Sequence, residues 1–526
     1  MTQVDILFER YGPKYQWLAS LTVLLGLVAL GMSITIVNVA TPYIKGAFGM
    51  SADQVQWLST GFLAATTVAL LVAPWLVSAF GQRATYITVL MIFIAASFMG
   101  GLATGMGAII AARIIQGAMT GLIRPVALEA LFAVFPANQR GMATAMYGMS
   151  LGLPLTLATV IGGWLVETYN WRYVFFIVPP ICMAAIVMAY FFLPPRESSG
   201  PRPPFDWFGA GSLFIAIFAL LTALSNGQRW GWHSNGVISL IVASMLIAGL
   251  FIWWERRVDK PLLDLAIFRN KGFLMGAASL FLFGGAFYGI MYLLPNFVQA
   301  ILHYDPVKAG ILFTPSTLVL AILVPIVGKL SDRVPPHYLT LPGLAFAIFA
   351  VYQMSQVDRF TSFSSLAVSM ALLSVGMAAF PPPTLSRAIS SLPPRLIGFG
   401  SGAINFAMQM GGAFGTATLV TLMDQRTLFH SAHLTDGLNA GNPMAMQALS
   451  QLQSAYAAAG TNAVYQQAAS LRALGNMDAL WASIFAYQDG FWAVVAGLIL
   501  VVVPSCLLSR WSGWSGETDS PKWEAD

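Results

Sequence analysis

The sequence predicts an all-α protein that crosses a membrane many times. Of its 526 residues, 57% are hydrophobic and only 9% are charged, whereas an ordinary soluble domain carries about 25% charged residues. Fourteen apolar runs are long enough to span a bilayer, which takes about 20 residues each. Lipid offers the backbone no hydrogen bonds, so we expect each run to be a helix.

The apolar runs fall into three groups. Leu193–Asp206 is rich in proline and ends the first six runs, and the charged Glu255–Lys271 follows two more. We therefore expect two six-helix bundles and two inserted helices, divided as 1–193, 194–271 and 272–526. Two six-helix halves around a midplane site are typical of secondary transporters. In order, the runs are 17–40, 54–79, 84–104, 106–134, 140–166, 171–193, 207–225, 235–254, 272–301, 307–331, 338–356, 362–385, 396–424 and 486–509.

The positive charges of the loops predict the orientation. With the N-terminus inside, 17 of the 26 Lys and Arg residues lie on the inner side and 7 on the outer side. Inner loops carry the excess of positive charge, so we expect a multi-pass protein of a bacterial cytoplasmic (inner) membrane with both termini in the cytoplasm.

The composition also argues against a metal centre or an enzyme. The two cysteines, Cys182 and Cys506, lie in apolar runs and cannot form a metal cluster. His430 and His433 are three residues apart but lack neighbouring Cys or acidic ligands. No cluster of acids, His or Ser–Lys pairs lies within the spans. We expect no catalytic residues, no metal and no cofactor, with a proton gradient as the energy source.

Charged residues inside the run 109–136 are the main functional signal. It contains Arg113, Arg124 and Glu129, and a charge at membrane depth costs about 2.5–3.5 kcal/mol, so it usually faces a wet cavity or a partner. On an ideal helix Arg113 and Arg124 project about 20° apart, while Pro125 makes the phase of Glu129 uncertain. Alternatively, Arg113 is a structural strut bonded to carbonyls and Glu129 reaches water at the helix end.

The segment 425–485 is a long loop on the expected outer face. MAMQALSQLQSAYAAAG and NAVYQQAASLRALGNM within it have apolar residues at helical spacing. We expect two amphipathic helices outside the membrane. They either cap the bundle or form a docking surface for another envelope protein, because long loops often carry contacts.

A series of motifs runs through the whole chain. The first half contains SITIVNVATP at 33–42, RIIQG at 113–117, and GGW and NWRYVFF between 162 and 176. The second half contains YLLPNFVQ at 292–299, GKLSDR at 328–333, and GAIN at 402–405 with Gln409 and several glycines after it. In this order they resemble the fourteen-span drug:H+ antiporters of the major facilitator superfamily, the EmrB/QacA type. The resemblance implies a major facilitator fold.

Three motifs depart from the family pattern. The first helix usually carries an acid where Ser33 stands, so one presumed proton carrier is missing. Ser78-Ala79 replaces the Asp–Arg pair of the first inner loop, which only Asp332-Arg333 retains. The family's fifth helix usually carries a Gly-Pro motif that is associated with exporters. In this chain Ala158-Thr159 stands in its place.

We therefore predict three sets of functional residues. Glu129 takes the proton-coupling role, with Arg113 and Arg124 as its tuners, unless it is a gate residue paired with Arg140 or Arg83. Asp332, Arg333 and Arg83 form the conformational gate. The substrate cavity is lined by polar and aromatic residues: Ser33, Asn38, Gln116, Tyr288, Tyr292, Asn296, Gln299, Asn405 and Gln409. Each isolated Asn or Gln could instead be a bond between helices worth about 0.6 kcal/mol.

The sequence favours one function and leaves two rivals. We expect a proton-coupled exporter of hydrophobic or amphipathic small molecules that works by alternating access. It could form the inner-membrane part of a tripartite system with a periplasmic adaptor protein and an outer-membrane channel. The rivals are a dedicated exporter of one metabolite, such as a siderophore or fatty acid, and a membrane sensor or scaffold that transports nothing. Nucleic acid is not an expected partner.

Overall fold

The computed structural model describes residues 3–136, 139–196, 204–258, 261–331, 333–437 and 442–511, and all regular structure in them is helical. The helices before residue 260 are α1 Gln3–Tyr11, η1 Gly12–Lys14, α2 Tyr15–Phe48, α3 Ala52–Phe80, α4 Gln82–Gly101, α5 Met106–Val134, α6 Arg140–Thr168, α7 Tyr173–Phe176, α8 Val178–Phe192, α9 Trp207–Trp230 and α10 Asn235–Glu255. The later helices are η3 Leu265–Arg269, α11 Lys271–Ala300, α12 Pro306–Ile311, α13 Thr314–Ser331, α14 His337–Met354, α15 Phe363–Ala379, α16 Pro381–Ser390, η4 Pro394–Leu396, α17 Ile397–Gly437, α18 Pro443–Ala458 and α19 Ala463–Trp511.

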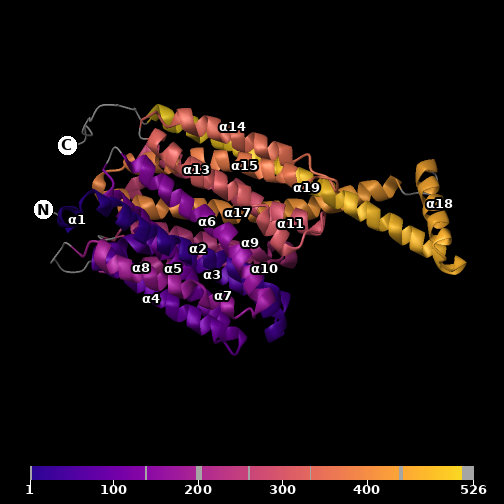
Figure 1. The fold of residues 1–526 in the computed structure, drawn as a ribbon, viewed down its shortest axis with the longest axis horizontal. Coiled ribbons are helices and arrows are strands. Elements are labelled where there is room, and N and C mark those ends of the chain that lie inside the picture. The colour runs from indigo at the N-terminus through magenta and orange to yellow at the C-terminus, as the bar shows by residue number, and fades with distance from the viewer. Residues whose placement is uncertain are drawn as a thin grey trace.

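The long helices run roughly side by side along one axis (Figure 1). The start of α2 and the end of α19 lie at one end of the bundle, here called the terminal end. At the other end, α17, α18 and α19 project beyond the remaining helices, and we call this the hairpin end. The orientation of the two ends across a membrane stays a prediction.

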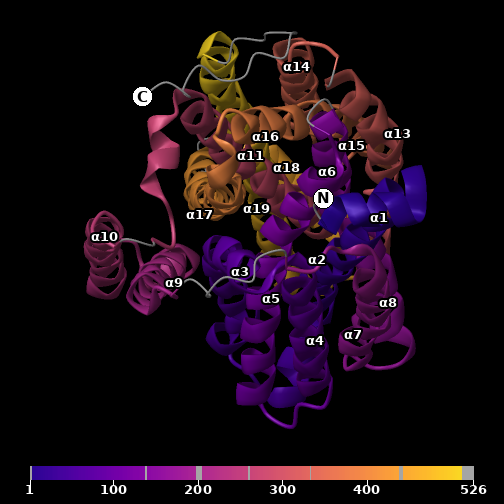
Figure 2. The same ribbon diagram turned by 90° about the vertical axis from the view of Figure 1, so that its left-hand side faces the viewer.

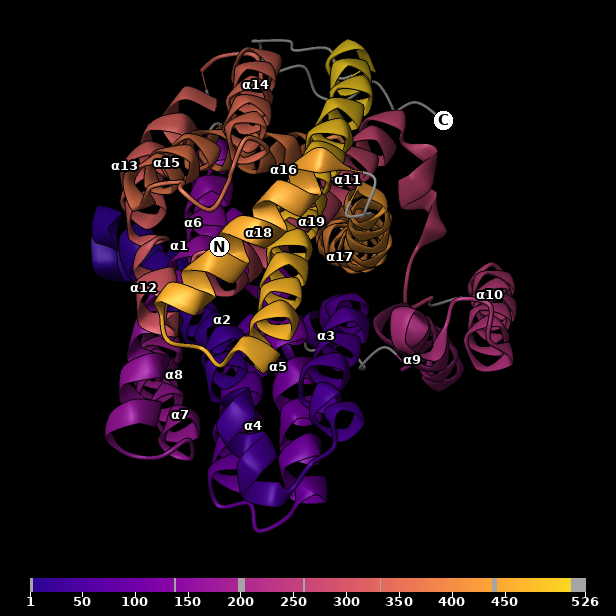
Figure 3. The ribbon, with the colours of Figure 1, turned by 90° about the vertical axis from the view of Figure 1, so that its right-hand side faces the viewer.

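Seen along the axis, the bundle has two halves and a flank (Figures 2 and 3). Helices α2–α5, α7 and α8 fill one half, α11 and α13–α19 fill the other, and α6 lies at the boundary. The inserted pair α9 and α10 stands to one side, where α9 packs on α3 and α17. Division of the chain at residues 193 and 271 remains our prediction, although the pair lies where that division would place it.

Twelve of the described helices are long and apolar enough to cross a membrane. Two further expected spans, 140–166 and 338–356, correspond to α6 and α14, which are helical and pack against spanning helices. The all-helical membrane fold is therefore confirmed, and the count of fourteen spans stays a prediction.

Glycines bring helices of the same half into close contact. A side chain at Gly117 or Gly121 of α5 would collide with the carbonyl oxygens of Phe62 or Thr66 on α3. In the other half, Gly411 of α17 meets the backbone of α11 in the same way. Small residues permit such close backbone approach in membranes, where packing rather than the hydrophobic effect holds helices together.

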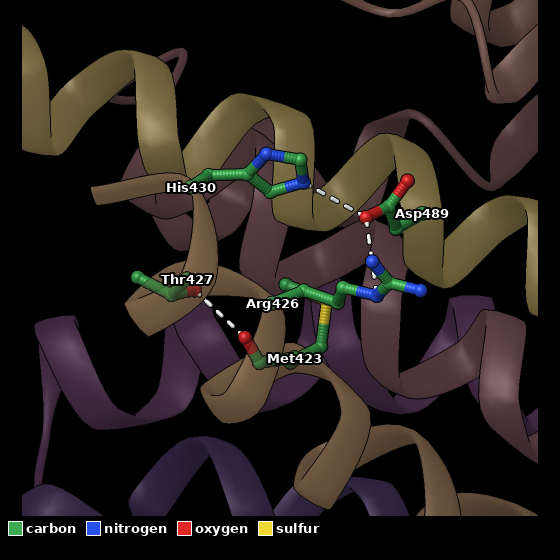
Figure 4. A network of polar contacts seen from close by, with 5 residues as sticks. All are labelled: Met423, Arg426, Thr427, His430 and Asp489. Carbon is green, nitrogen blue, oxygen red and sulfur yellow. Dashed lines mark hydrogen bonds and ion pairs between the residues drawn. The ribbon is translucent and has the colours of Figure 1, made fainter. Parts of the chain in front are cut away.

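The hairpin end differs from what the sequence predicted. Only α18 is a separate helix, and it buries no residue. The second expected amphipathic helix is the first part of α19, a single helix of 49 residues that runs on into the membrane-spanning stretch. His430 and Arg426 of α17 contact Asp489 of α19 at 2.8 Å and 3.5 Å (Figure 4). The Arg426 ion pair and the His430 hydrogen bond join the projecting helices to each other.

Candidate transport pathway

A central cavity of about 330 Å³ lies between the two halves of the bundle. Its lining comes from α2, α5, α6, α11, α13, α15, α16 and α17, together with Phe313 between α12 and α13. Most of the lining is apolar. The residues are Leu27, Gly31, Ile34, Thr35, Asn38, Thr120, Ile123, Arg124, Gly148, Ser150, Pro154, Phe283, Phe287, Tyr288, Met291, Pro295, Phe313, Leu320, Val324, Met377, Pro381, Pro382, Asn405, Met408 and Gln409.

Two of the three polar contacts at this cavity join α17 to helices of the first half. Arg124 Nη1 donates to Gln409 Oε1 at 3.1 Å, and Tyr288 Oη donates to the same oxygen at 3.2 Å. Tyr147 Oη donates to Asn405 Oδ1 at 2.7 Å. The amides of α17 therefore bond to α5 and α6 across the cavity, in positions from which a bound compound could compete for them.

Arg113 lies elsewhere, in the packed core of the first half. Its side chain is 1% exposed and donates to the Leu58 carbonyl, the Ser33 carbonyl and hydroxyl, and Gln116 Oε1, all at 3.1–3.2 Å. The guanidinium carbon also lies 4.2 Å from the centre of the Phe62 ring. This arrangement is the structural strut that the sequence left open as an alternative.

The placement of the expected cavity residues is mixed. Asn38, Tyr288, Asn405 and Gln409 line the central cavity, and Tyr292 lines neighbouring spaces on the hairpin side. Ser33 and Gln116 are buried against Arg113 and are not part of the cavity lining in this structure. Asn296 and Gln299 are exposed near the end of α11 and are absent from the cavity lining. Functional roles for all of these residues stay predictions.

Glu129 lies in a separate vestibule at the terminal end, with a volume of about 1000 Å³. Arg140, Arg196 and Arg395 line the same space. A Cβ atom on Gly398, at the start of α17, would lie 3.7 Å from Glu129 Oε2. The structure thus separates Glu129 from Arg124, which faces the central cavity, and from Arg113, which is buried in the core. The expected coupling residues do not form one cluster.

A layer of close helix contacts stands between vestibule and cavity. Gly402 lies on α17 between Gly398 of the vestibule and Asn405 of the cavity, and its Cβ position is 2.7 Å from the Leu70 carbonyl oxygen of α3. Similarly, the Cβ position of Gly328 on α13 is 2.8 Å from Ala145 of α6. The two halves are therefore in contact on the terminal side of the cavity.

The predicted gate residues are only partly described. Arg83 lies in the first turn of α4, and its Nε donates to the Leu193 carbonyl at 2.6 Å. Arg333 is exposed just after α13. Asp332 lies outside the described residues, so the expected arrangement of the gate stays a prediction.

Sequence reasoning missed the apolar wall of the cavity. Phe283, Phe287, Met291 and Pro295 of α11 all line it, and their spacing of four residues puts them on one helix face. That periodicity was available in the sequence. Tyr147 was also missed, and nothing in the local sequence marks it, because its partner Asn405 is 258 residues away.

Comparison with known proteins identifies the family. The model of the Major Facilitator Superfamily matches residues 23–416. The chain belongs to this superfamily. Its members are transporters rather than enzymes, and the expected fold is confirmed.

Named relatives agree with the EmrB/QacA resemblance. The multidrug export protein EmrB of Escherichia coli K12 is 28% identical over 476 residues, covering 89% of this chain and 92% of EmrB. The tetracenomycin C resistance and export protein of Streptomyces glaucescens is 29% identical, covering 78% and 76%. Among solved structures, the human organic anion transporter MFSD10 (TETRAN) has a TM-score of 0.57 at 16% identity, covering 92% and 99%. This structural likeness supports the fold alone.

Proposed function

We propose that the protein exports hydrophobic or amphipathic small molecules across a bacterial cytoplasmic membrane in exchange for protons. The central cavity carries the proposal, because it lies between the two halves and combines an apolar, aromatic wall with a few polar groups. Such a lining suits compounds recognised by shape and stacking. Homology to EmrB and the tetracenomycin exporter supports export as the direction.

Alternating access would move the contact layer. With the terminal end in the cytoplasm, the contacts of Gly402 with α3 and of Gly328 with α6 close the cavity on the cytoplasmic side. Separating them would join the vestibule to the cavity and admit a compound. Rocking of one half against the other around a fixed site is the expected motion in such folds.

Glu129 is our candidate for the proton-coupling residue. It is half-buried beside the contact layer, and it faces the first turn of α17, which belongs to the other half. The amino-terminal end of a helix attracts a negative charge. Ionised Glu129 would hold α17 against the first half, and protonation would weaken that contact and ease opening.

Everted membrane vesicles with an imposed pH gradient, acid inside, test the function. Fluorescent amphiphiles from a panel should accumulate inside the vesicles while protons leave the lumen. Neither event should occur in vesicles without the protein. In the Glu129→Gln variant, gradient-driven accumulation should fall to background while exchange without a gradient persists. Glu9→Gln, an exposed acid on α1, is the matched control and should behave as the unmodified protein.

Three results would each count against a different part of this proposal. Normal proton-driven accumulation in Glu129→Gln would remove Glu129 from the coupling role and leave export intact. Absence of flux for every compound would instead favour a sensor or scaffold. Accumulation of a single compound class would support a dedicated exporter.

The projecting helices support a further part of the proposal, contact with a periplasmic adaptor protein that leads to an outer-membrane channel. Large apolar side chains there are exposed, among them Leu428 at 72%, Met444 at 80% and Val464 at 79%. The contacts of Asp489 with Arg426 and His430 join α17 and α19 in the projection (Figure 4). Replacing residues 438–462 by a short linker should abolish efflux from intact cells but preserve uptake by everted vesicles. Full efflux from such cells would exclude an essential docking role.

A further inference from the structure

A second cavity, the side chamber, adjoins the central cavity. It measures about 540 Å³ and shares Asn38, Tyr288 and Gln409 with the central cavity. Its remaining wall comes from α3, α9, α11 and α17 and from Trp232, just after α9. The inserted helix α9 therefore forms one wall of this chamber, and it lies beside the seam between the two halves (Figure 3).

Four polar groups of the chamber wall bond to one another in two pairs. Trp232 Nε1 donates to Thr421 Oγ1 at 2.9 Å, and Thr60 Oγ1 donates to Ser225 Oγ at 3.4 Å. These bonds tie the inserted segment to α17 and α3. An apolar group inside the chamber would leave these four groups with their partners, and it would contact side chains such as Leu63, Leu221 and Ala417. An apolar group buried beside these four polar groups therefore strands none of them.

Hydrogen-bond donors converge where the two spaces meet. Gln409 Oε1 accepts from both Arg124 and Tyr288. Gly412 lies one turn further along α17, and a side chain there would collide with the Tyr288 ring. The missing side chain at Gly412 thus allows the Tyr288 ring to lie at this junction.

Arg124 gives the combined space a positive charge. It is the one side chain charged at neutral pH among the described residues that line either space. Gln409, which accepts a hydrogen bond from Arg124 in the cavity, is neutral. A cation at membrane depth normally has a counter-ion, and a guanidinium matches the geometry of a carboxylate or phosphate.

We infer that the central cavity and the side chamber form one binding site for anionic amphiphiles. The acidic head group binds Arg124 beside Tyr288, and the apolar tail occupies the side chamber under α9. This inference rests on the proposed transport function and assigns its substrate class. Cationic amphiphiles with the same tail are disfavoured, because their head group meets Arg124.

Equilibrium binding to the purified full chain in lipid nanodiscs tests the charge preference. The probes are dodecanoate and dodecyltrimethylammonium, and dodecanoate should bind more tightly. Arg124→Gln should weaken dodecanoate binding by about tenfold or more, the usual effect of losing a charge-assisted hydrogen bond. Binding of dodecyltrimethylammonium should not weaken. Arg359→Gln, an exposed arginine between α14 and α15, should change neither probe.

Tail length tests the side chamber. Each buried methylene contributes about fourfold to affinity, so dodecanoate should bind well above octanoate. Ala417→Phe on α17 and Ser225→Phe on α9 fill the chamber from opposite walls and should remove this advantage while octanoate still binds. Ile215→Phe, on the exposed face of α9, is the control. Should neither filled variant fold, saturated fatty acids of increasing length on the unmodified protein decide, because affinity must stop rising once the chamber is full.

The outcomes separate this inference from the proposed function. Equal or tighter binding of the cation, unchanged dodecanoate affinity in Arg124→Gln, or a length advantage that survives filling would overturn the inference. Proton-driven flux of other compounds would persist in that case. The expected binding pattern without flux in everted vesicles would instead keep the site and reject the transport function.

Discussion

Arg113 and Arg124 stand on the same helix, eleven residues apart, and have opposite environments. Arg113 is packed among α2, α3 and α5, with four acceptors at 3.1–3.2 Å. Arg124 is half-buried, faces the central cavity and donates to the neutral Gln409 of the other half. The helical phase that places both on one face is shared, so the neighbouring helices decide the difference. A buried arginine indicates a functional site here only where its guanidinium keeps donors that a ligand can engage.

Replacing each arginine by methionine should have the largest effect and should separate the two. Arg113→Met removes the bonds donated to the Leu58 and Ser33 carbonyls and leaves Gln116 Oε1 without its donor, which should lower the free energy of unfolding by about 3 kcal/mol. Arg124→Met should lower it by less than about 1 kcal/mol, because Gln409 keeps its bond from Tyr288. Denaturation by SDS in bicelles measures both, and Arg359→Met is the control.

The same pair must diverge in binding. Arg124→Met should lose dodecanoate binding at unchanged stability, whereas any binding loss in Arg113→Met should be proportional to the fraction unfolded. Equal destabilisation by the two substitutions would show that Arg124 also supports the fold, and the contrast drawn between them would fail.

Much of this fold was readable from the sequence because membrane segments obey local rules. Apolar length predicts spans, and the glycine of the motif RIIQG, Gly117, lies in the structure against the backbone of Phe62. The extent of α17 and α19 was not readable. Both remain helical past the apolar stretch, where no glycine or proline interrupts 416–436 or 476–489, and hydropathy reports the membrane boundary rather than the helix end.

The site was less predictable than the fold. Periodicity placed Arg113 and Arg124 together, but only tertiary contacts tell that Ser33 bonds to one and Gln409 to the other. The side chamber depends on Trp232 meeting Thr421, 189 residues away. No local pattern carries that information, and the resemblance to antiporters gave motif positions rather than cavity walls.

The smallest expected effect comes from Ser33→Asp, which restores the acid that the resembled family carries in its first helix. Ser33 Oγ lies 3.2 Å from Arg113 Nη1, so an aspartate there would pair with Arg113. Attraction and desolvation nearly cancel for a buried pair, so the free energy of unfolding should change by less than about 1 kcal/mol. In the Arg113→Gln background the same aspartate would be an uncompensated buried charge and should cost about 3 kcal/mol. A double-mutant cycle measures this coupling, and additive effects would contradict the pairing. Dodecanoate affinity should not change, because Ser33 lies in the Arg113 cluster and not in the cavity lining.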